Sequence, residues 1–362
     1  MRYTLCDSNE KDITSIQEDT VKKQAAIIGF GGMGQRHYSA YTSLGVDIVA
    51  IADWDTEKVK KILPDFEGDR IYGDYKDLLR CEKGNLDILS VVTNGPTHAE
   101  VTCQGSEAGI PNILCEKPMA TNLSDAGRVI EICSRNNTRL AVNHIRRWSS
   151  NYARIKELIG ARRIGEIRHL YFNCGSTGLG NFAIHFFDTA RYISGSEPEW
   201  AIGFLDPTGT PNPRGSCFSD PGGYGIIKFR NGVRFFVDTS EDTGVQYTFQ
   251  IVGSRGRIII DELNDSWLIR ARSESDKDVP FTRYGTDMPE LSFRSAGKFD
   301  IVRLTSLAMQ ELLNGGPISS TGIDGLKSLE MVIGIHLSDH CGNRSISFPI
   351  SGTGREIDVK IA

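Results

Sequence analysis

Residues 25–34 have the sequence AAIIGFGGMG, a short apolar run that leads into a glycine-rich loop. The apolar run predicts a buried strand, and the stretch from Met33 to about Leu44 predicts a helix. The glycines therefore match Gly-x-Gly-x-x-Gly between a strand and a helix, and a second apolar run, VDIVAIAD, ends at Asp53 about 20 residues further on. This combination predicts a dinucleotide-binding site; a glycine turn that only packs is the alternative.

The glycine loop and its acidic residue predict how the cofactor binds. Gly29 permits a tight turn, Gly31 lets the backbone approach a pyrophosphate at the helix N-terminus, and Gly34 lets the helix pack on the strand. Asp53 would bond the adenosine ribose and repel a 2′-phosphate, and no Lys or Arg stands at residues 54 or 55, so we expect NAD rather than NADP. The loop comprises Gly29, Phe30, Gly31, Gly32, Met33 and Gly34, and Trp54 is a candidate for the adenine pocket or an exposed loop residue.

The alternation of apolar strands and helices from residue 25 to about residue 144 is typical of a doubly wound parallel sheet. After Trp148 the pattern changes to strands and turns, and Asn231-Gly232 predicts a type I′ hairpin turn. Helices are expected at about 295–313 and 322–339. The predicted fold class is α/β plus α+β: a parallel sheet over residues 25–147, then a mostly antiparallel open-sheet domain over residues 148–362. Residues 1–24 are an N-terminal extension.

The composition is that of a globular protein with a small-molecule partner. The chain has 362 residues, about two domains at roughly 100–200 residues each. Its formal net charge of −5 is opposite to what phosphate neutralisation requires, so no nucleic-acid partner is expected. The eight cysteines show neither CxxC nor zinc-site spacing, which predicts reduced thiols and no metal site. No apolar run approaches the ~20 residues that span a bilayer, and the N-terminal segment lacks the apolar core of a signal peptide, so we expect a cytoplasmic protein without a membrane partner.

Glu116-Lys117-Pro118, within the fourth predicted strand segment, connects the chain to a known family. With the other motifs it resembles the glucose–fructose oxidoreductase/inositol dehydrogenase (Gfo/Idh/MocA) family, from about residue 25 to the C-terminus. The other matching segments are Gly29–Gly34 with Asp53, Thr93–His98, Arg146–Trp148, Ile184–Asp188 with its His-x-x-Asp pattern, Ile251–Gly256 and Asp324–Leu326. The resemblance implies an N-terminal Rossmann domain and a C-terminal domain that binds substrate and forms oligomers.

The resemblance also implies an activity: an NAD-dependent dehydrogenase or reductase acting on the CH–OH group of a sugar, a sugar derivative or a nucleotide sugar. Such a reaction needs a base for the hydroxyl proton and a cation or donor for the developing alkoxide. Lys117 lies just past a strand end, where doubly wound folds bind ligands, and could polarise the substrate oxygen; the family implies a cis peptide before Pro118. His185 titrates near neutral pH and is the natural base. A surface lysine and a core histidine are the structural alternatives.

Asn181 departs from the pattern of the inositol-dehydrogenase-like members, which have an aspartate four residues before this histidine. An amide can orient the imidazole or hold the substrate, but it cannot exchange a proton. Asn181 is therefore a candidate catalytic residue without the proton-relay role. The sequence around it is similar to that of relatives acting on nucleotide-linked sugars.

The remaining candidates lie around these three residues. Thr93, Asn94, Pro96 and His98 belong to a predicted helix start near the nicotinamide, and Glu116 could bond the nicotinamide ribose. Candidate substrate contacts are Asn143, Arg146, Arg147 and Asp188. An arginine fork suits a carboxylate or a phosphate, whereas salt bridges at the domain junction are the alternative, and a structural role is the alternative for Asp188.

Two other interpretations of the same fold stay open. One is a glycosidase that uses bound NAD transiently and forms no net NADH. The other is a non-catalytic NAD-binding regulator, which Lys117 and His185 argue against and Asn181 leaves open. Because the sheet of the second domain is expected to have an exposed face, which is often an oligomer interface in the family, we expect a homodimer or a homotetramer.

Overall fold

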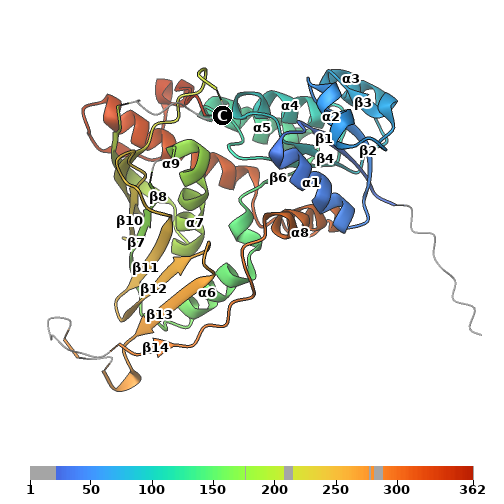
Figure 1. The fold of residues 1–362 in the computed structure, drawn as a ribbon. Helices are drawn as coiled ribbons and strands as arrows, with labels where there is room; N and C mark the ends of the chain where they lie inside the picture. Colours follow the sequence, from blue (N-terminus) through green and yellow to red (C-terminus); the bar gives the residue numbers. More distant parts are fainter. Residues whose placement is uncertain (1–21, 176, 208–214, 277–278, 281–287, 362) are drawn as a thin grey trace, which may run out of the picture.

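Two β-sheets organise the chain, a parallel sheet in the first half and a mostly antiparallel sheet in the second (Figure 1). The structure is a computed structural model that describes residues 22–175, 177–207, 215–276, 279–280 and 288–361. Most of the predicted N-terminal extension, residues 1–21, therefore lies outside the described residues. The predicted fold class, α/β plus α+β, is confirmed.

The first sheet has the strand order β3-β2-β1-β4-β5-β6, and its neighbouring strands are parallel. Its strands are β1 (Gln24–Ile28), β2 (Asp47–Ala52), β3 (Ile71–Tyr72), β4 (Ile88–Val91), β5 (Asn112–Cys115) and β6 (Arg139–Val142). Its helices are α1 (Gly32–Ser43), α2 (Thr56–Ile62), α3 (Tyr75–Cys81), α4 (Gly95–Glu107) and α5 (Leu123–Arg135). β4 and β5 are buried along their whole length, as continuous apolar runs in a covered parallel sheet require. The order reverses between β1 and β4, so ligands are expected in the crevice at the carboxyl ends of these strands.

The second sheet has nine described strands in the order β14-β13-β12-β11-β7-β10-β9-β8-β15. They are β7 (Ile167–Asn173), β8 (Pro198–Leu205), β9 (Gly223–Phe229), β10 (Arg234–Asp238), β11 (Thr248–Gly253), β12 (Gly256–Asp261), β13 (Ser266–Ala271), β14 (Glu290–Leu291) and β15 (Ile346–Ser347). β7 and β10 pair in parallel, and the other pairs are antiparallel. Helices α6 (Ser150–Gly160), α7 (Ile184–Ser194) and α9 (Gly322–His340) lie along one face of this sheet (Figure 1). The sequence did not predict α6.

The hairpin between β9 and β10 differs from its prediction. The Phe229 N–H donates to the Val233 carbonyl at 2.8 Å, so the loop consists of residues 230–232 rather than of Asn231-Gly232 alone. Gly232 has a φ of +86°, whereas Asn231 has no positive φ and instead accepts a hydrogen bond from the Val233 N–H through its side chain. A type I′ turn needs positive φ at both central residues, so that prediction is wrong.

Helix α8 (Ile301–Asn314) returns from the second half of the chain to the first sheet (Figure 1). Ala308, Met309 and Leu312 of α8 belong to one buried cluster with Phe30 and Tyr41. The helix begins six residues later than predicted from the sequence, because the Asp300 side chain caps it by accepting the Arg303 N–H. The second half of the chain thus contributes to the packing of the first.

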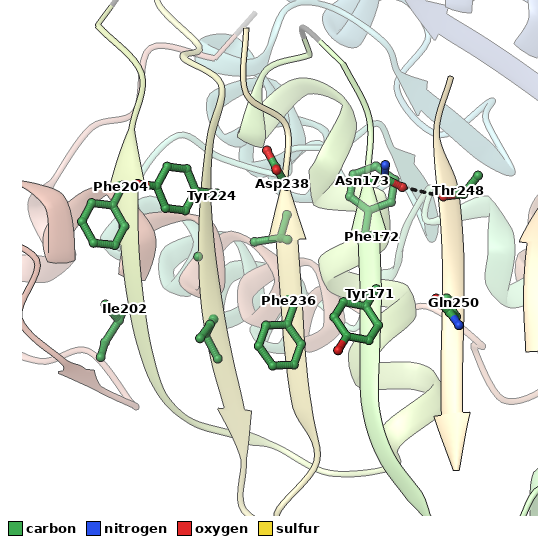
Figure 2. A pocket seen from close by; sticks show the side chains of 13 residues that line it. Tyr171, Phe172, Asn173, Ile202, Phe204, Tyr224, Phe236, Asp238, Thr248 and Gln250 are labelled. Carbon is green, nitrogen blue, oxygen red and sulfur yellow. Dashed lines mark hydrogen bonds between the residues drawn. The ribbon is translucent and has the colours of Figure 1, made fainter. Parts of the chain in front are cut away.

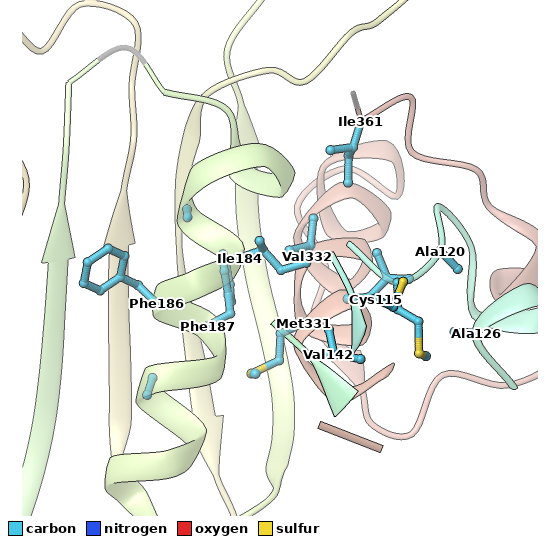
Figure 3. Close-up of a cluster of buried hydrophobic side chains, with 14 of the residues drawn as sticks. Cys115, Ala120, Ala126, Val142, Ile184, Phe186, Phe187, Met331, Val332 and Ile361 are labelled. Carbon is cyan, nitrogen blue, oxygen red and sulfur yellow. The ribbon is translucent and has the colours of Figure 1, made fainter. Parts of the chain in front are cut away.

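A single buried cluster also connects the two sheets (Figure 3). Ile184 and Phe187 of α7 and Val332 of α9 pack in the same cluster as Cys115 at the end of β5 and Val142 at the end of β6. The carboxyl edge of the parallel sheet is therefore fixed against α7 and α9 by close packing.

Membrane-spanning helices, disulfides and metal clusters are absent from the described residues. Among them, no helix is both long and apolar enough to cross a membrane. The seven cysteines that the structure describes are free thiols. Within the same residues, no cluster of three or more His, Cys, Asp or Glu side chains has metal-binding geometry.

Candidate active site

The three motif glycines of the loop after β1 have different surroundings. Gly29 has a φ of +95°, and a Cβ there would lie 2.5 Å from the Val92 carbonyl oxygen. A Cβ on Gly34 would collide with the carbonyl group of Gly29. A Cβ on Gly31 would meet no atom of the described residues within 4 Å. The fold therefore needs Gly29 and Gly34, whereas Gly31 leaves open space at the start of α1.

That open space belongs to a cavity of about 520 Å³ at the carboxyl ends of β1, β2 and β4. Of the predicted cofactor residues, the cavity is lined by Gly29, Gly31, Asp53, Trp54, Thr93 and Asn94. No side chain of the described residues caps the N-terminus of α1, so its first amide N–H groups are available to an anion. The residues present therefore fit a dinucleotide whose pyrophosphate lies at α1 and whose adenosine half lies toward Asp53.

Asp53 and Trp54 form the far end of this cavity. The Asp53 carboxylate accepts the Phe30 N–H at 2.6 Å and the Asp55 N–H at 2.9 Å, so the backbone of two loops fixes its position. The Trp54 side chain is 88% exposed although it lines the cavity. Phe30 itself is buried in the core, so within the loop it acts through packing and through its amide.

His98 connects the loop after β4 to the loop after β5. Its Nδ1 lies 2.7 Å from the Pro118 carbonyl oxygen, and its Nε2 lies 2.9 Å from the Thr93 carbonyl oxygen. Burial lowers the pKa of His98, although the two carbonyl groups act in the opposite direction. Pro96, at the first turn of α4, lies on the exposed surface nearby. The structure thus gives His98 a bridging position between two loops of the crevice.

Glu116 lies in a buried network beneath these loops. Its Oε1 accepts a hydrogen bond from Asn143 Nδ2 at 2.6 Å and lies 3.1 Å from His37 Nε2, and its Oε2 accepts the Lys117 N–H at 3.3 Å. Burial alone would raise the pKa of Glu116, but His37, Lys117 and Asn143 together lower it to about 2. Asn143 is therefore bonded to Glu116. His37, which the sequence did not mark as a site residue, is its second partner.

Lys117, Asn181 and His185 meet where the loop after β5 faces the start of α7. The peptide between Lys117 and Pro118 is cis, as the resemblance implied. Lys117 Nζ donates to the Asn181 backbone carbonyl at 2.5 Å and lies 3.4 Å from its Oδ1. Burial, followed by the positive charges of Lys117 and Arg146, holds the pKa of His185 well below its usual value, so the imidazole is neutral at pH 7.

A wide helical turn, η3 (Leu179–Ala183), leads into α7 and carries Asn181. Turns of this π type occur mostly within α-helices and often at functional sites. The Asp220 carboxylate accepts the Gly180 N–H at 2.8 Å and the Asn181 N–H at 2.6 Å, which fixes the turn. Asp220 could not be predicted as a site residue, because it lies far from Asn181 along the chain in a loop without a motif.

Both predicted substrate-binding arginines form buried ion pairs. Arg146 of η2 (Ile145–Trp148) donates to the Glu262 carboxylate at 2.9 and 2.6 Å, and the Tyr152 and Tyr247 hydroxyl groups donate to the same carboxylate. Arg147 donates to both oxygens of Asp188. Both arginines thus form salt bridges of the kind expected as the alternative to substrate contact.

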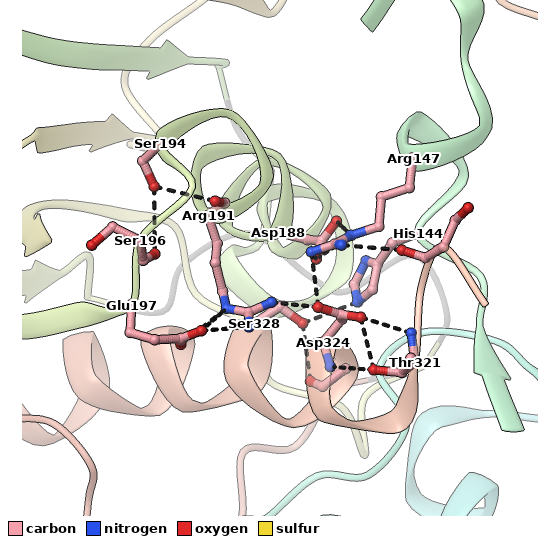
Figure 4. A network of polar contacts seen from close by, with 12 residues as sticks. His144, Arg147, Asp188, Arg191, Ser194, Ser196, Glu197, Thr321, Asp324 and Ser328 are labelled. Atoms are coloured by element: carbon pink, nitrogen blue, oxygen red, sulfur yellow. Dashed lines mark hydrogen bonds and ion pairs between the residues drawn. The ribbon is translucent and has the colours of Figure 1, made fainter. Parts of the chain in front are cut away.

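Asp188 and Arg147 belong to a larger set of paired charges (Figure 4). We call Arg147, Asp188, Arg191, Glu197 and Asp324 the junction network. Arg147 lies 3.1 Å from Asp324, and Arg191 pairs with both Asp324 and Glu197. The network joins η2, α7 and α9 beside the Lys117 site. Asp188 is thus paired with Arg147, a contact expected of a structural partner.

His144, immediately before η2, lies between the junction network and His185. Its Nε2 lies 3.0 Å from Ser328 Oγ (Figure 4). Its ring meets that of His185 edge-on, with 6.1 Å between the ring centroids. Sequence reasoning did not select His144, although its place directly after the strand β6 is the same kind of position that marked Lys117.

Comparisons with known proteins agree with this fold. A family model described as an oxidoreductase family with an NAD-binding Rossmann fold matches residues 23–144, and its C-terminal alpha/beta domain model matches residues 156–346. A myo-inositol 2-dehydrogenase of Thermotoga maritima is 25% identical over 84% of this chain and 92% of its own. A D-apiose dehydrogenase of Paraburkholderia graminis is 24% identical over 90% of each chain.

Solved structures show the same fold. An inositol dehydrogenase homologue from Azotobacter vinelandii, solved with NADH and myo-inositol, superposes with a TM-score of 0.75. The match covers 90% of this chain and 98% of that chain at 17% sequence identity. The likeness in fold therefore extends over both sheets.

Proposed function

Because the chain belongs to the Gfo/Idh/MocA family of oxidoreductases with an NAD-binding Rossmann fold, we propose that it transfers a hydride between NAD and the CH–OH carbon of a sugar or sugar derivative. The observation that carries the proposal is the meeting of Lys117, Asn181 and His185 at the carboxyl edge of the parallel sheet. The dehydrogenases of myo-inositol and D-apiose among its relatives support a polyhydroxylated substrate.

Each of the three residues has a role that its contacts support. Lys117 is a cation at the end of β5 and stabilises the developing alkoxide of the substrate. His185, neutral because its pKa is held low, accepts the hydroxyl proton. Asn181 holds the Lys117 ammonium through its carbonyl and presents an amide to the substrate. Bound NAD supplies the carbon that accepts or returns the hydride.

The preference for NAD over NADP is part of the proposal and rests on Asp53. Its carboxylate lies in the cavity where the adenosine ribose is expected, and backbone N–H groups hold it there. A ribose hydroxyl can donate to such a carboxylate, whereas a 2′-phosphate is repelled by it. Thr93 and Asn94 line the other end of the cavity, toward the nicotinamide.

For Arg146, Arg147, Asp188 and Asn143 we propose positioning rather than direct substrate contact. Each is bonded to another side chain of this protein: Glu262 holds Arg146, Asp188 holds Arg147, and Glu116 holds Asn143. A substrate carboxylate or phosphate would have to displace a buried protein carboxylate from either arginine, which leaves a buried charge unpaired. A substrate that is uncharged at its reacting ring suits this site better.

The open face of the second sheet supports a homodimer or homotetramer (Figure 2). The ring of Tyr171 stacks on Phe236 and that of Phe204 on Tyr224, on the face that the helices leave uncovered. Tyr171, Phe204 and Tyr224 are 38%, 36% and 47% exposed and line a hollow of about 610 Å³. Light scattering should give a dimer or tetramer mass, and a monomer mass would contradict the proposed oligomer.

We also propose a cytoplasmic location, which the free thiols of the described residues support.

Two alanine variants test the activity. In Lys117→Ala and His185→Ala, turnover of NAD with the sugar that the wild type oxidises should fall by roughly 100-fold or more, as expected for the loss of a general base or an alkoxide stabiliser. A screen of cyclitols, aldoses and nucleotide sugars, monitored by NADH absorbance, identifies that sugar. NADH binding, followed by fluorescence titration, should be unchanged.

Lys83→Ala serves as the matched control, because this lysine is exposed and does not line the cavity. Near-wild-type turnover in both site variants would contradict the assignment. Release of a sugar without net NADH would instead support an NAD-requiring glycosidase.

A further inference from the structure

Two buried imidazole nitrogens in the active site have no hydrogen-bond partner among the described residues: Nδ1 of His144 and Nδ1 of His185. The two rings meet edge-on with 6.1 Å between their centroids and an interplanar angle of 88°. An unsatisfied buried polar group destabilises the folded state, so two at one place call for a common explanation.

The protonation of His144 follows from its other nitrogen. Ser328 Oγ donates its hydroxyl hydrogen to the Gly325 carbonyl at 3.0 Å. The hydroxyl has one hydrogen, so while Ser328 donates to Gly325 it is an acceptor toward His144 Nε2, 3.0 Å away, and this arrangement places the His144 proton on Nε2. Burial lowers the pKa of His144, which keeps the ring neutral, so its Nδ1 is a bare acceptor.

His185 supplies the complementary group. A neutral imidazole carries one N–H, and the nitrogen that carries it is set by the bond the ring makes. If His185 Nδ1 carries the hydrogen, it donates toward His144 Nδ1, directly after a small ring shift or through one water molecule, and both unpartnered atoms are satisfied. Nε2 of His185 is then the nitrogen with a free lone pair.

We propose that His144 is a positioning residue that holds His185 in the Nδ1–H tautomer, so that Nε2 is the base for the substrate hydroxyl. The proposal rests on the proposed function of His185. It also identifies a group that could orient His185 in a chain where residue 181 is an asparagine. In this chain an amide stands where inositol-dehydrogenase-like relatives have an aspartate, so the orienting acceptor is His144, between β6 and η2, and not residue 181 of η3. When Nε2 takes the hydroxyl proton, the Nδ1–H stays on His185 and continues to donate to His144.

The charges around the two rings are compatible with this arrangement. Asp188 of α7, Asp324 of α9, Arg147 of η2 and Lys117 of the loop after β5 act on His144. Arg147, Asp188 and Asp324 are already paired with one another in the junction network. Lys117, Arg146 and His144 act on His185, and no carboxylate among them competes for its Nδ1–H.

Two substitutions of His144 separate positioning from packing. In His144→Asn, the amide oxygen is bonded to Cγ, as Nδ1 of histidine is, so it can still accept a hydrogen bond from His185. In His144→Gln, the amide reaches the Nε2 position and Ser328, but no acceptor remains at the Nδ1 position. His144→Asn thus keeps the contact with His185, whereas His144→Gln keeps the contact with Ser328.

The measurement is the ¹⁵N spectrum of the full chain labelled on histidine, with NAD added and no substrate, because the two nitrogens of a neutral imidazole differ clearly in chemical shift. We expect His185 as the Nδ1–H tautomer in the wild type and in His144→Asn, and a shift toward the Nε2–H tautomer in His144→Gln. With myo-inositol or D-apiose, whichever forms NADH, kcat should fall roughly 10- to 100-fold in His144→Gln and much less in His144→Asn, as for other residues that orient a functional histidine. NADH affinity should stay unchanged in both.

An Nε2–H tautomer of His185 in the wild type, or equal tautomer populations in the Asn and Gln variants, would overturn the proposal. If His144 variants do not fold, Ser328→Ala tests the same arrangement, because it removes the acceptor that places the proton on His144 Nε2. It should weaken the His185 preference, and an unaltered preference would contradict the proposal. Since the spectrum needs no turnover, absence of activity on every sugar would count against the proposed function alone.

Discussion

The cofactor crevice and the junction network fix their geometry in opposite ways. In the crevice, around Gly29–Gly34 and Asp53, backbone contacts determine the geometry. Gly29 has a left-handed conformation and packs closely against Val92, and two backbone N–H groups donate hydrogen bonds to the Asp53 carboxylate. At the junction, side chains from η2, α7 and α9 hold one another through paired charges (Figure 4). The geometry of the crevice is determined by short segments of the sequence, whereas that of the junction network depends on residues far apart in sequence.

The largest effect on stability is expected where a buried charge loses its partner beside the junction. Arg146→Met should lower the free energy of unfolding by about 3–5 kcal/mol, because Glu262 stays buried with two tyrosine hydroxyl groups and no cation. Denaturant unfolding checks it. The double variant Arg146→Met/Glu262→Met should regain most of the loss, since removal of both charges leaves none unpaired. A loss below about 1 kcal/mol in the single variant would mean that the pair is not what holds this junction.

Between the two regions, Glu116 should give the protein an acid-sensitive stability. Its pKa in the folded chain is about 2 against an ordinary value of 4.5, so its carboxylate stabilises the fold above pH 4.5 and that contribution disappears as the pH falls toward 2. The contribution amounts to at most about 3 kcal/mol. In Glu116→Gln, the free energy of unfolding should be lower at pH 7 and should fall less between pH 5 and pH 3. If the free energy of unfolding falls equally with pH in the wild type and the variant, Glu116 is not the titrating group.

Two glycines of the crevice should separate folding from cofactor binding. Gly34→Ala should destabilise the chain by about 1–3 kcal/mol, because its methyl group collides with the Gly29 backbone. Gly31→Ala has open space around its Cβ, so stability should be kept, but the methyl group occupies the cavity. NADH affinity should fall about tenfold or more in Gly31→Ala, a loss of 1.4 kcal/mol at least. If Gly31→Ala binds NADH as well as the wild type, the pyrophosphate does not lie at this loop.

The contrast also explains how much the sequence could predict. Gly29–Gly34, Asp53 and Glu116–Pro118 could be proposed from the sequence because each motif is local, and the strand–helix alternation predicts that they lie at one sheet edge. The pairing of Arg146 with Glu262, or of Asn181 with Asp220, joins residues that only the folded chain brings together, so the arginine prediction left two alternatives open. The packing of α8 on the first sheet is of the same kind. At Asn231-Gly232 a local rule failed because the side chain of Asn231 offered the backbone another bond.

The smallest expected effect, a change in cofactor preference at Asp53, is the sharpest test of the crevice. Two contributions act there: the ribose hydroxyls lose an acceptor when the carboxylate is removed, and a 2′-phosphate gains when the charge is removed. Asp53→Asn keeps an acceptor oxygen of the same size and removes only the charge. Asp53→Ser removes most of the acceptor as well. The ratio of NADPH to NADH affinity, measured by fluorescence titration, should therefore rise about tenfold in Asp53→Asn, or 1.4 kcal/mol, and further in Asp53→Ser through weaker NADH binding. Equal ratios in wild type and both variants would show that a residue other than Asp53, such as the cavity-lining Lys58, sets the preference.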